Sequence, residues 1–404
     1  MGEIRGDSIG DGCPWHTRAW CFQERVLSPR TLVFTGGTVY WACRSAMWHE
    51  TREGEPDGHN VTNQSRTAVS NWRNFPLKRH PWPDLRQYFD LVEGYNRRNL
   101  TFESDAVNAF TAITTVMSNS FPGGFLFGIP VFLFDIGMLW TRASPLTRRN
   151  GFPSWSWLGW AGDVRLLYEY AEAWNPRFSY NHAEANIRPL VNWYSTHRDT
   201  NSRQLIDNSY HLYGTCEQNP NFRTPAGWIK TWDEEDNRHA FYHENLPQVK
   251  FKFPIPLFPA ITDDQTRLST PHLKFVAESC TLVLGRHAFE WTSIGCLEVD
   301  LYDPQGHWAG ILESPFKCKD DYVRGSPCEL IAISQGYAKE LVVGFRPLVE
   351  MEKRKELKKS KIYEFYNILW VEYAAGVAHR KALGRVWKDA WKRQNVKTIE
   401  VVLG

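Results

Sequence analysis

The hydrophobic periodicity of this 404-residue chain changes near residue 165. Before that point, apolar residues recur at helical spacing, as at Leu85, Tyr88, Phe89, Val92 and Tyr95, and this predicts an amphipathic helix. Beyond it come short β-rich runs such as "LKFVAESCTLVLG" and "CELIAIS", which predict strands. The change indicates an α+β fold, in which helices and strands are segregated along the chain.

The first regular segment is expected at residues 18–27, "RAWCFQERVL", as a short helix. Ser28-Pro29 should end this helix, because the residue before a proline is pushed out of the helical region. The runs "TLVF" and "TVYWAC" then flank a glycine pair, which is the pattern of a β-hairpin. Residues 50–66 are almost entirely polar and mark the first predicted boundary between domains.

The segment from residue 100 to residue 140 contains a helix and an apolar stretch. Ser104 is the predicted N-cap of a helix with Phe110 and Met117 on its apolar face. The apolar stretch at residues 123–140 is barely long enough to cross a bilayer, and it carries Pro130 and Asp135. A buried core segment is therefore the better interpretation of this stretch.

The composition limits the classes of function. The formal net charge of +2 argues against a dedicated nucleic-acid binder, because no strong basic footprint exists to recruit phosphates. The N-terminal residues contain no apolar signal segment. The eight cysteines are then best interpreted as reduced thiols. We therefore predict a cytoplasmic protein that is not inserted in a membrane.

The N-terminal cysteines and histidines raise the question of a metal site. The candidates are Cys13, His16, Cys21, Cys43 and His49. Zinc sites favour short paired spacings, and only Cys13 and His16 stand close together. We therefore expect no bound metal. The usual motifs of hydrolases, nucleotide-binding proteins and zinc proteases are also missing from the sequence, so the residues alone assign no enzymatic activity.

Three ordered blocks nevertheless resemble the fungal heterokaryon-incompatibility (HET) domain family. They are "RAWCFQERVLSPRTLVFTGGTVYWAC", "LVEGYNRRNLTFESDAVNAFTAI" and "GMLWTR" followed by "GFPSWSWLGWAG". The residues that carry the resemblance are Arg18, Trp20, Gln23, Glu24, Ser28, Arg30, Tyr95, Arg98, Asp105, Trp140, Pro153, Ser154, Trp155, Ser156 and Trp157. Beyond residue 165 no defined motif block matches, and the chain resembles the family only in its general sequence pattern.

The family resemblance implies a role in non-self recognition and programmed-cell-death signalling, with a protein partner. Members of the family begin with blocks resembling "LSYxWG" and "WIDxLCIxQ", and neither occurs in this sequence. The expectation is therefore an N-terminally truncated protein. Residues 1–50 would be the C-terminal remnant of a TIR-like α/β HET domain, residues 51–165 a helical connector, and residues 166–404 a strand-rich region.

The relationship of the family to TIR domains suggests one catalytic candidate. Trp20, Cys21 and Glu24 match a TIR-like W-C-x-x-E motif. In NAD-cleaving TIR enzymes, the matching glutamate lies beside the nicotinamide ribose, where a carboxylate can stabilise an oxocarbenium-like centre. The alternative is a structural Glu24 near a helix end, with Trp20 in the core. No cofactor is expected of this chain, and NAD would be expected only if the missing N-terminal blocks were present.

The tryptophans of the third block allow two interpretations. In the first, the chain is a non-catalytic interaction module, and Trp155, Trp157 and Trp160 lie at its docking surface. In the second, they form a packed corner between the helical connector and the strand-rich region. Apolar runs flank the segment, and Pro153 and Gly159 punctuate it, which favours the packed corner.

Overall fold

The structure is a computed structural model of the whole chain. It describes residues 14–35, 38–43, 47–50, 77, 83–121, 123–142, 144–166, 187–208, 224, 226–234, 238–251, 269–290, 297–313, 323–339 and 362–404. The α-helices are α1 (Pro14–Thr17), α2 (Ala19–Leu27), α4 (Leu85–Asn96), α5 (Asn108–Met117), α6 (Phe134–Gly137) and α9 (Lys388–Lys392). Short 3₁₀ segments lie at Glu103–Ala106 and Trp157–Gly159.

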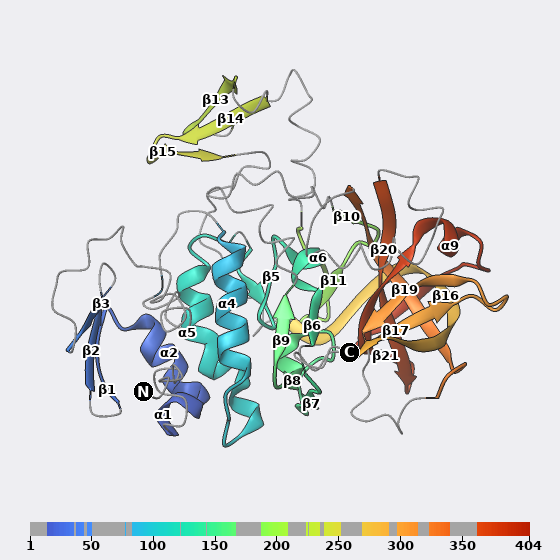
Figure 1. Ribbon diagram of the computed structural model, residues 1–404, viewed down its shortest axis with the longest axis horizontal. Helices are drawn as coiled ribbons and strands as arrows, with labels where there is room; N and C mark the ends of the chain where they lie inside the picture. Colours follow the sequence, from blue (N-terminus) through green and yellow to red (C-terminus); the bar gives the residue numbers. More distant parts are fainter. Residues whose placement is uncertain are drawn as a thin grey trace, which may run out of the picture.

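The strands of the first half are β1 (Arg30–Thr35), β2 (Thr38–Cys43), β3 (Met47–His49), β4 (Phe125–Leu126), β5 (Ile129–Pro130), β6 (Trp140–Arg142), β7 (Thr147–Arg148), β8 (Trp160–Ala161) and β9 (Val164–Leu166). Those of the second half are β10 (Arg188–Pro189), β11 (Tyr194–His197), β12 (Arg203–Leu205), β13 (Trp228–Asp233), β14 (Arg238–His243), β15 (Leu246–Phe251), β16 (Ser269–Glu290), β17 (Leu297–Tyr302), β18 (Trp308–Glu313), β19 (Pro327–Lys339), β20 (Ile362–Ala374), β21 (Val377–Trp387) and β22 (Lys397–Leu403). Figure 1 labels most of these elements.

The predicted N-terminal helix and hairpin are confirmed. Helix α2 ends at Leu27, and the Ser28 backbone N–H and hydroxyl both donate to the Glu24 carbonyl at 3.1 and 2.6 Å. Strands β1 and β2 pair antiparallel without a bulge, and β3 extends them to a three-stranded sheet. The polar segment predicted at 50–66 lies almost entirely outside the described residues.

Helix α4 is confirmed, but the predicted start of the next helix is wrong. The Asp84 side chain caps α4 by accepting the Gln87 backbone N–H at 2.9 Å. Helix α5 begins at Asn108, and Ser104 lies in the preceding 3₁₀ segment. The Phe110 N–H donates to the Val107 carbonyl and not to the Ala106 carbonyl. The Ala106 carbonyl instead accepts a hydrogen bond from the Tyr95 hydroxyl at 2.7 Å. A tertiary hydrogen bond at Ala106 thus accompanies the later start of the α-helix.

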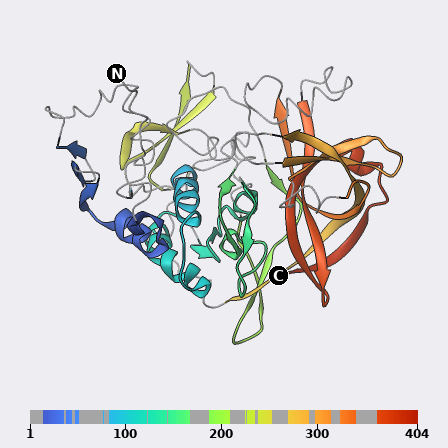
Figure 2. The same cartoon turned by 60° about the horizontal axis from the view of Figure 1, so that its bottom comes forward.

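The apolar stretch at residues 123–140 is buried, as predicted. It forms β4, β5, the single-turn helix α6 and the start of β6, and almost all its side chains are inaccessible to solvent. Figure 2 shows this segment and the rest of the green region between the N-terminal helices and the large sheet. Across the described residues, no helix has the length and apolar character needed to span a membrane.

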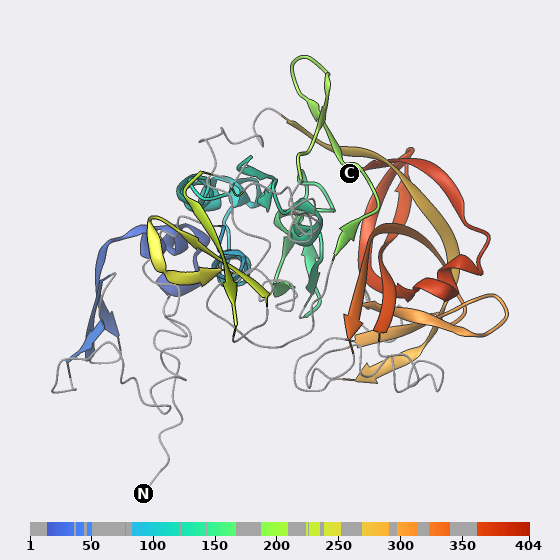
Figure 3. The ribbon, with the colours of Figure 1, turned by 90° about the horizontal axis from the view of Figure 1, so that it is seen from above.

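The described residues beyond 187 are dominated by one large antiparallel sheet that closes on itself. Strands β16, β19, β20, β21, β18 and β17 each pair with the next, and β17 pairs back with β16. The long strand β16 also pairs with β11 and β22 through its first half. The closed ring is visible at the right of Figure 3, while β13–β15 form a separate small sheet.

The closed sheet has two hydrophobic faces. Side chains such as Leu282, Leu330 and Trp370 fill its interior, where Trp391 of α9 joins them. Side chains of the other face, including Phe275 and Leu369, belong to a cluster that continues to Ala19 of helix α2. One hydrophobic cluster therefore connects the N-terminal helices to the outer face of the closed sheet.

The observed architecture confirms an α+β fold with a strand-rich C-terminal part. The TIR-like origin of residues 1–50 stays a prediction. The domain limits at residues 50 and 165 also stay predictions, because a shared hydrophobic cluster is compatible with one core and with an interface between two.

Candidate functional site: the junction of the three motif blocks

The first and second blocks contact each other at the N-terminus of α2. The Asn99 N–H donates to Thr17 at 2.7 Å, and the Ala19 N–H donates to Asn99 at 2.9 Å. The Phe22 ring packs against Tyr95 with centroids 6.0 Å apart. The Arg98 guanidinium lies over the same Phe22 ring at 4.7 Å. Residues that are 70 or more positions apart in the chain thus form one packed contact.

The exposed residues of the first block lie around this contact. Trp20 is 38% exposed and donates its indole N–H to Asp105 at 3.4 Å, so the interpretation of Trp20 as a core residue is wrong. Arg18 forms an isolated bridge with Asn99, and both Arg18 and Arg30 are exposed. These charged and aromatic side chains give the junction a solvent-facing side.

The second and third blocks meet inside the core. Trp157 packs edge-on against Tyr95 and Phe110, at centroid distances of 6.0 and 5.2 Å. Its indole N–H donates to the Tyr88 hydroxyl at 3.0 Å, and that hydroxyl donates to the Gly128 carbonyl at 2.5 Å. Gly128 has a φ of +78°, and a Cβ there would lie 2.7 Å from the Trp157 ring, so this approach requires glycine.

The third block also contacts the closed sheet. The Trp155 indole N–H donates to the Pro271 carbonyl on β16 at 3.0 Å. The Ser154 hydroxyl donates to the Gly404 carbonyl and accepts the Arg380 backbone N–H from β21 at 2.8 Å. Trp155 and Trp157 are fully buried. The packed-corner interpretation is therefore confirmed for these two tryptophans, and neither lies on a docking surface.

The turn that places both tryptophans is held by its own serine. Pro153 and Ser156 are buried, and the Ser156 hydroxyl accepts the Leu158 N–H at 3.0 Å while it donates to Phe127 at 2.6 Å. The Trp160 indole is half-buried and donates to the Ser154 carbonyl at 2.9 Å. The serines of the third block therefore satisfy backbone groups and have no free hydroxyl for chemistry.

The sequence did not indicate the arginines that complete the junction. The buried Arg380 guanidinium donates to the Met138 carbonyl at 2.8 Å and to the Trp140 carbonyl, and lies 3.9 Å from the Trp140 ring centroid. Burial lowers the pKa of Arg380 to about 9, so it stays charged at neutral pH. The Trp140 indole in turn donates to the Trp155 carbonyl at 2.8 Å. Only the tertiary structure brings these groups together.

A second missed pair lies next to helix α4. The buried Arg149 guanidinium donates to the Asn96 side chain at 2.8 Å, and the Asn96 amide donates to the Gly162 carbonyl at 2.9 Å. Burial lowers the pKa of Arg149. Polar residues are seldom fully buried, so no periodicity argument selects these two.

The proposed catalytic residue, Glu24, lies in the last turn of α2 with its side chain exposed. Gln23, beside it, is half-buried. Cys21 faces the core, and burial raises the pKa of its thiol, with the Glu24 charge adding to the effect. A catalytic carboxylate of this kind acts best where water is excluded, and the exposed position of Glu24 does not provide such an environment.

We expect the purified chain not to cleave NAD. Glu24 is exposed, and an exposed carboxylate gives little electrostatic stabilisation to a developing cation. Nicotinamide release from NAD, followed by chromatography, should stay at the buffer rate for both the native chain and Glu24→Ala. Release that is detectable with the native chain and disappears in Glu24→Ala would overturn this expectation.

The proposed metal candidates do not meet in the described part of the chain. Cys13 lies outside the described residues, and the side chains of His16 and His49 are not described. Cys21 is buried and Cys43 half-buried. Within the described residues, no group of three potential ligands is close enough to hold a metal. The absence of a metal stays a prediction.

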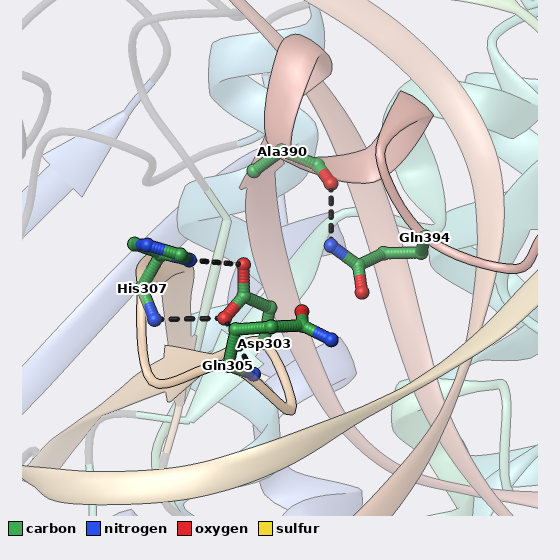
Figure 4. Close-up of polar contacts among 5 residues, drawn as sticks. All are labelled: Asp303, Gln305, His307, Ala390 and Gln394. Atoms are coloured by element: carbon green, nitrogen blue, oxygen red, sulfur yellow. Dashed lines mark hydrogen bonds and ion pairs between the residues drawn. The ribbon is translucent and has the colours of Figure 1, made fainter.

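The turn at residues 303–306, between β17 and β18, is closed by the Gly306 N–H donating to the Asp303 carbonyl at 2.9 Å, and an Asp–His pair lies at this turn. The Asp303 carboxylate accepts the Gln305 and His307 backbone N–H groups at 3.0 and 2.7 Å, and its second oxygen lies 3.1 Å from His307 Nδ1 (Figure 4). Nearby, the Gln394 amide donates to the Ala390 carbonyl at 2.8 Å. Because the Asp303 carboxylate holds three turn groups, its role is to fix the connection between β17 and β18.

Comparisons with protein-family models, with curated proteins and with solved structures found no match. The likeness to the HET family therefore rests on the three sequence blocks, and the contacts among their residues come from the structure.

Proposed function

We propose that the chain is a heterokaryon-incompatibility-like protein that acts in non-self recognition and programmed-cell-death signalling. One observation carries the proposal: residues of the three family-like blocks contact one another, through Phe22, Tyr95 and Trp157. The three blocks lie far apart in the chain, and the structure packs them against one another in one hydrophobic cluster. Their convergence supports the blocks as parts of a single inherited unit.

The same contacts support a signalling role through protein contacts over an enzymatic one. The block residues are mainly buried in packing and in backbone hydrogen bonds, as at Tyr95, Ser154 and Trp157. Glu24 is exposed. The first block also exposes apolar side chains, at Leu32 and Phe34 of β1, and exposed apolar surface favours association with another protein.

Inducible expression of the whole chain in a filamentous fungus tests this function. We expect induced hyphae to lose viability, measured by exclusion of a vital dye. Glu24→Ala should kill equally, and Trp157→Ala should not, because its fold is weakened. Full viability at a matched level of soluble native protein would contradict the proposal. Loss of killing in Glu24→Ala would favour the NAD-cleaving alternative.

A further inference from the structure

Strand β1 leaves one edge of a sheet open. It pairs with β2 on one side, and no described strand lies against its other side. The β1–β3 sheet lies at the end of the molecule away from the closed sheet (Figures 1 and 3). An open edge presents backbone N–H and C=O groups that can pair with a further strand.

Apart from the exposed Arg30 at its first position, β1 lacks the features that usually prevent such pairing. Its sequence, "RTLVFT", contains no lysine or proline, and its pairing with β2 has no bulge. Leu32 is 54% exposed and Phe34 is 72% exposed, both on the same face of the strand. A regular edge strand with exposed apolar side chains is prone to pair with another strand.

The hairpin determines which backbone groups point outward. Thr35 and Thr38 are paired across a two-residue loop, and such a closing pair exchanges both of its hydrogen bonds. Hydrogen-bonded and non-bonded pairs alternate along an antiparallel ladder. The backbone groups of Leu32 and Phe34 therefore face away from β2, towards the open edge.

We propose that β1 pairs antiparallel with β1 of a second copy of this chain, about a two-fold axis at Val33. This register places Leu32 opposite Phe34 of the second copy and Thr31 opposite its Thr35, so each residue faces one of its own kind. Arg30 falls outside the paired segment, and no like charges meet. A register centred on Leu32 would instead place Arg30 opposite Phe34.

The contact is small, so the association is weak. It consists of the backbone hydrogen bonds of Leu32 and Phe34 and two Leu–Phe side-chain contacts, each worth about 1 kcal/mol or less. Interfaces well below about 1,200 Å² form transient complexes. The inference goes beyond the proposed function and does not depend on it, because it concerns only the solution state of the chain.

Sedimentation velocity of the full chain over a concentration series tests the association. The native chain is expected to shift towards a dimer as its concentration rises. Leu32→Lys is expected to raise the dissociation constant at least about tenfold, because lysine on an edge strand opposes pairing. Leu205→Lys is the matched control, since Leu205 is 53% exposed on another edge strand, β12. It is expected to dimerise like the native chain.

A chain that stays monomeric at every concentration overturns the proposal. So does equal weakening by Leu32→Lys and Leu205→Lys, which would indicate non-specific apolar contact. Circular-dichroism melting of each variant checks that the fold is intact. A negative result in this assay leaves the fungal viability assay unaffected, so the two proposals fail separately.

Cysteine cross-linking tests the register. With the axis at Val33, two Val33→Cys copies form a directly opposed, non-bonded pair, whose separation of about 4.5 Å between Cα atoms suits a disulfide. Phe34→Cys copies are offset diagonally by about 7–8 Å, beyond disulfide reach. Mild oxidation is expected to give covalent dimer with Val33→Cys, above the level of the native chain. Faster cross-linking of the more exposed Phe34→Cys overturns this register.

Discussion

Trp157→Ala is expected to lower the free energy of unfolding by about 3–5 kcal/mol, the usual cost of removing a buried tryptophan. Trp157 is fully buried, and its ring packs against both Tyr95 and Phe110. Alanine would leave a cavity there and remove the hydrogen bond to the Tyr88 hydroxyl. Urea denaturation followed by circular dichroism measures the loss as a lower midpoint at an unchanged slope.

Trp20→Ala is the matched control for this loss. Trp20 has the same side chain and lies in the first motif block, but it is 38% exposed. Its single hydrogen bond, to Asp105, spans 3.4 Å. We expect this substitution to cost about 1 kcal/mol or less. Equal costs at positions 20 and 157 would show that Trp157 does not hold the junction together.

The second large effect is a dependence of stability on pH that comes from Asp135. This carboxyl group is fully buried, and it accepts the Trp193 indole N–H at 2.8 Å and the Asn208 amide. Burial raises its pKa from 3.8 to about 7, although the two hydrogen bonds oppose the shift. No charged side chain of the described residues contributes to the pKa of Asp135.

The sign of the effect follows from where the proton is held. Between about pH 4 and pH 7, the folded chain retains the Asp135 proton and the unfolded chain releases it. The contribution of Asp135 to stability is therefore complete at low pH, falls as the pH rises to about 7, and is constant above that value. Over this range the loss is about 4 kcal/mol, at about 1.4 kcal/mol for each pKa unit.

Asp135→Asn isolates this contribution from the other carboxylates. Asparagine still accepts the Trp193 N–H, and a rotated Asn208 amide can accept its new N–H group. The unfolding free energy of Asp135→Asn minus that of the native chain should rise by about 4 kcal/mol between pH 4 and pH 8. Parallel stability curves over this range would contradict the burial of an ionisable Asp135.

Local sequence signals predicted the elements of residues 18–43 and helix α4, but not the short strands β4–β9. These signals act within a few residues, so they can be recognised directly in the sequence. They are the helix stop at Ser28-Pro29, the periodicity of α4 and the glycine pair between β1 and β2. Ser104 is not the N-cap, and the Ala106 carbonyl of the 3₁₀ segment that contains it accepts a hydrogen bond from Tyr95, eleven residues earlier in the chain. A capping rule cannot include a tertiary hydrogen bond.

The closed sheet and most of the junction could not be predicted from the sequence. The ring depends on β16 pairing with β19 and on β18 pairing with β21, and such long-range pairings leave no local pattern. Arg380 is some 240 residues from the Trp140 carbonyl that it binds. The resemblance to the HET family selected Trp155 and Trp157, but only their burial distinguished packing from docking.

Native-state hydrogen exchange of Trp157→Ala tests the central claim most directly, namely that the three motif blocks hold the helices and the closed sheet together as one unit. The account predicts that amide protection falls together in α4, on one side of the junction, and in β16 and β21, on the other. Loss of protection confined to α4 and α5, with β16 and β21 unchanged, would contradict it.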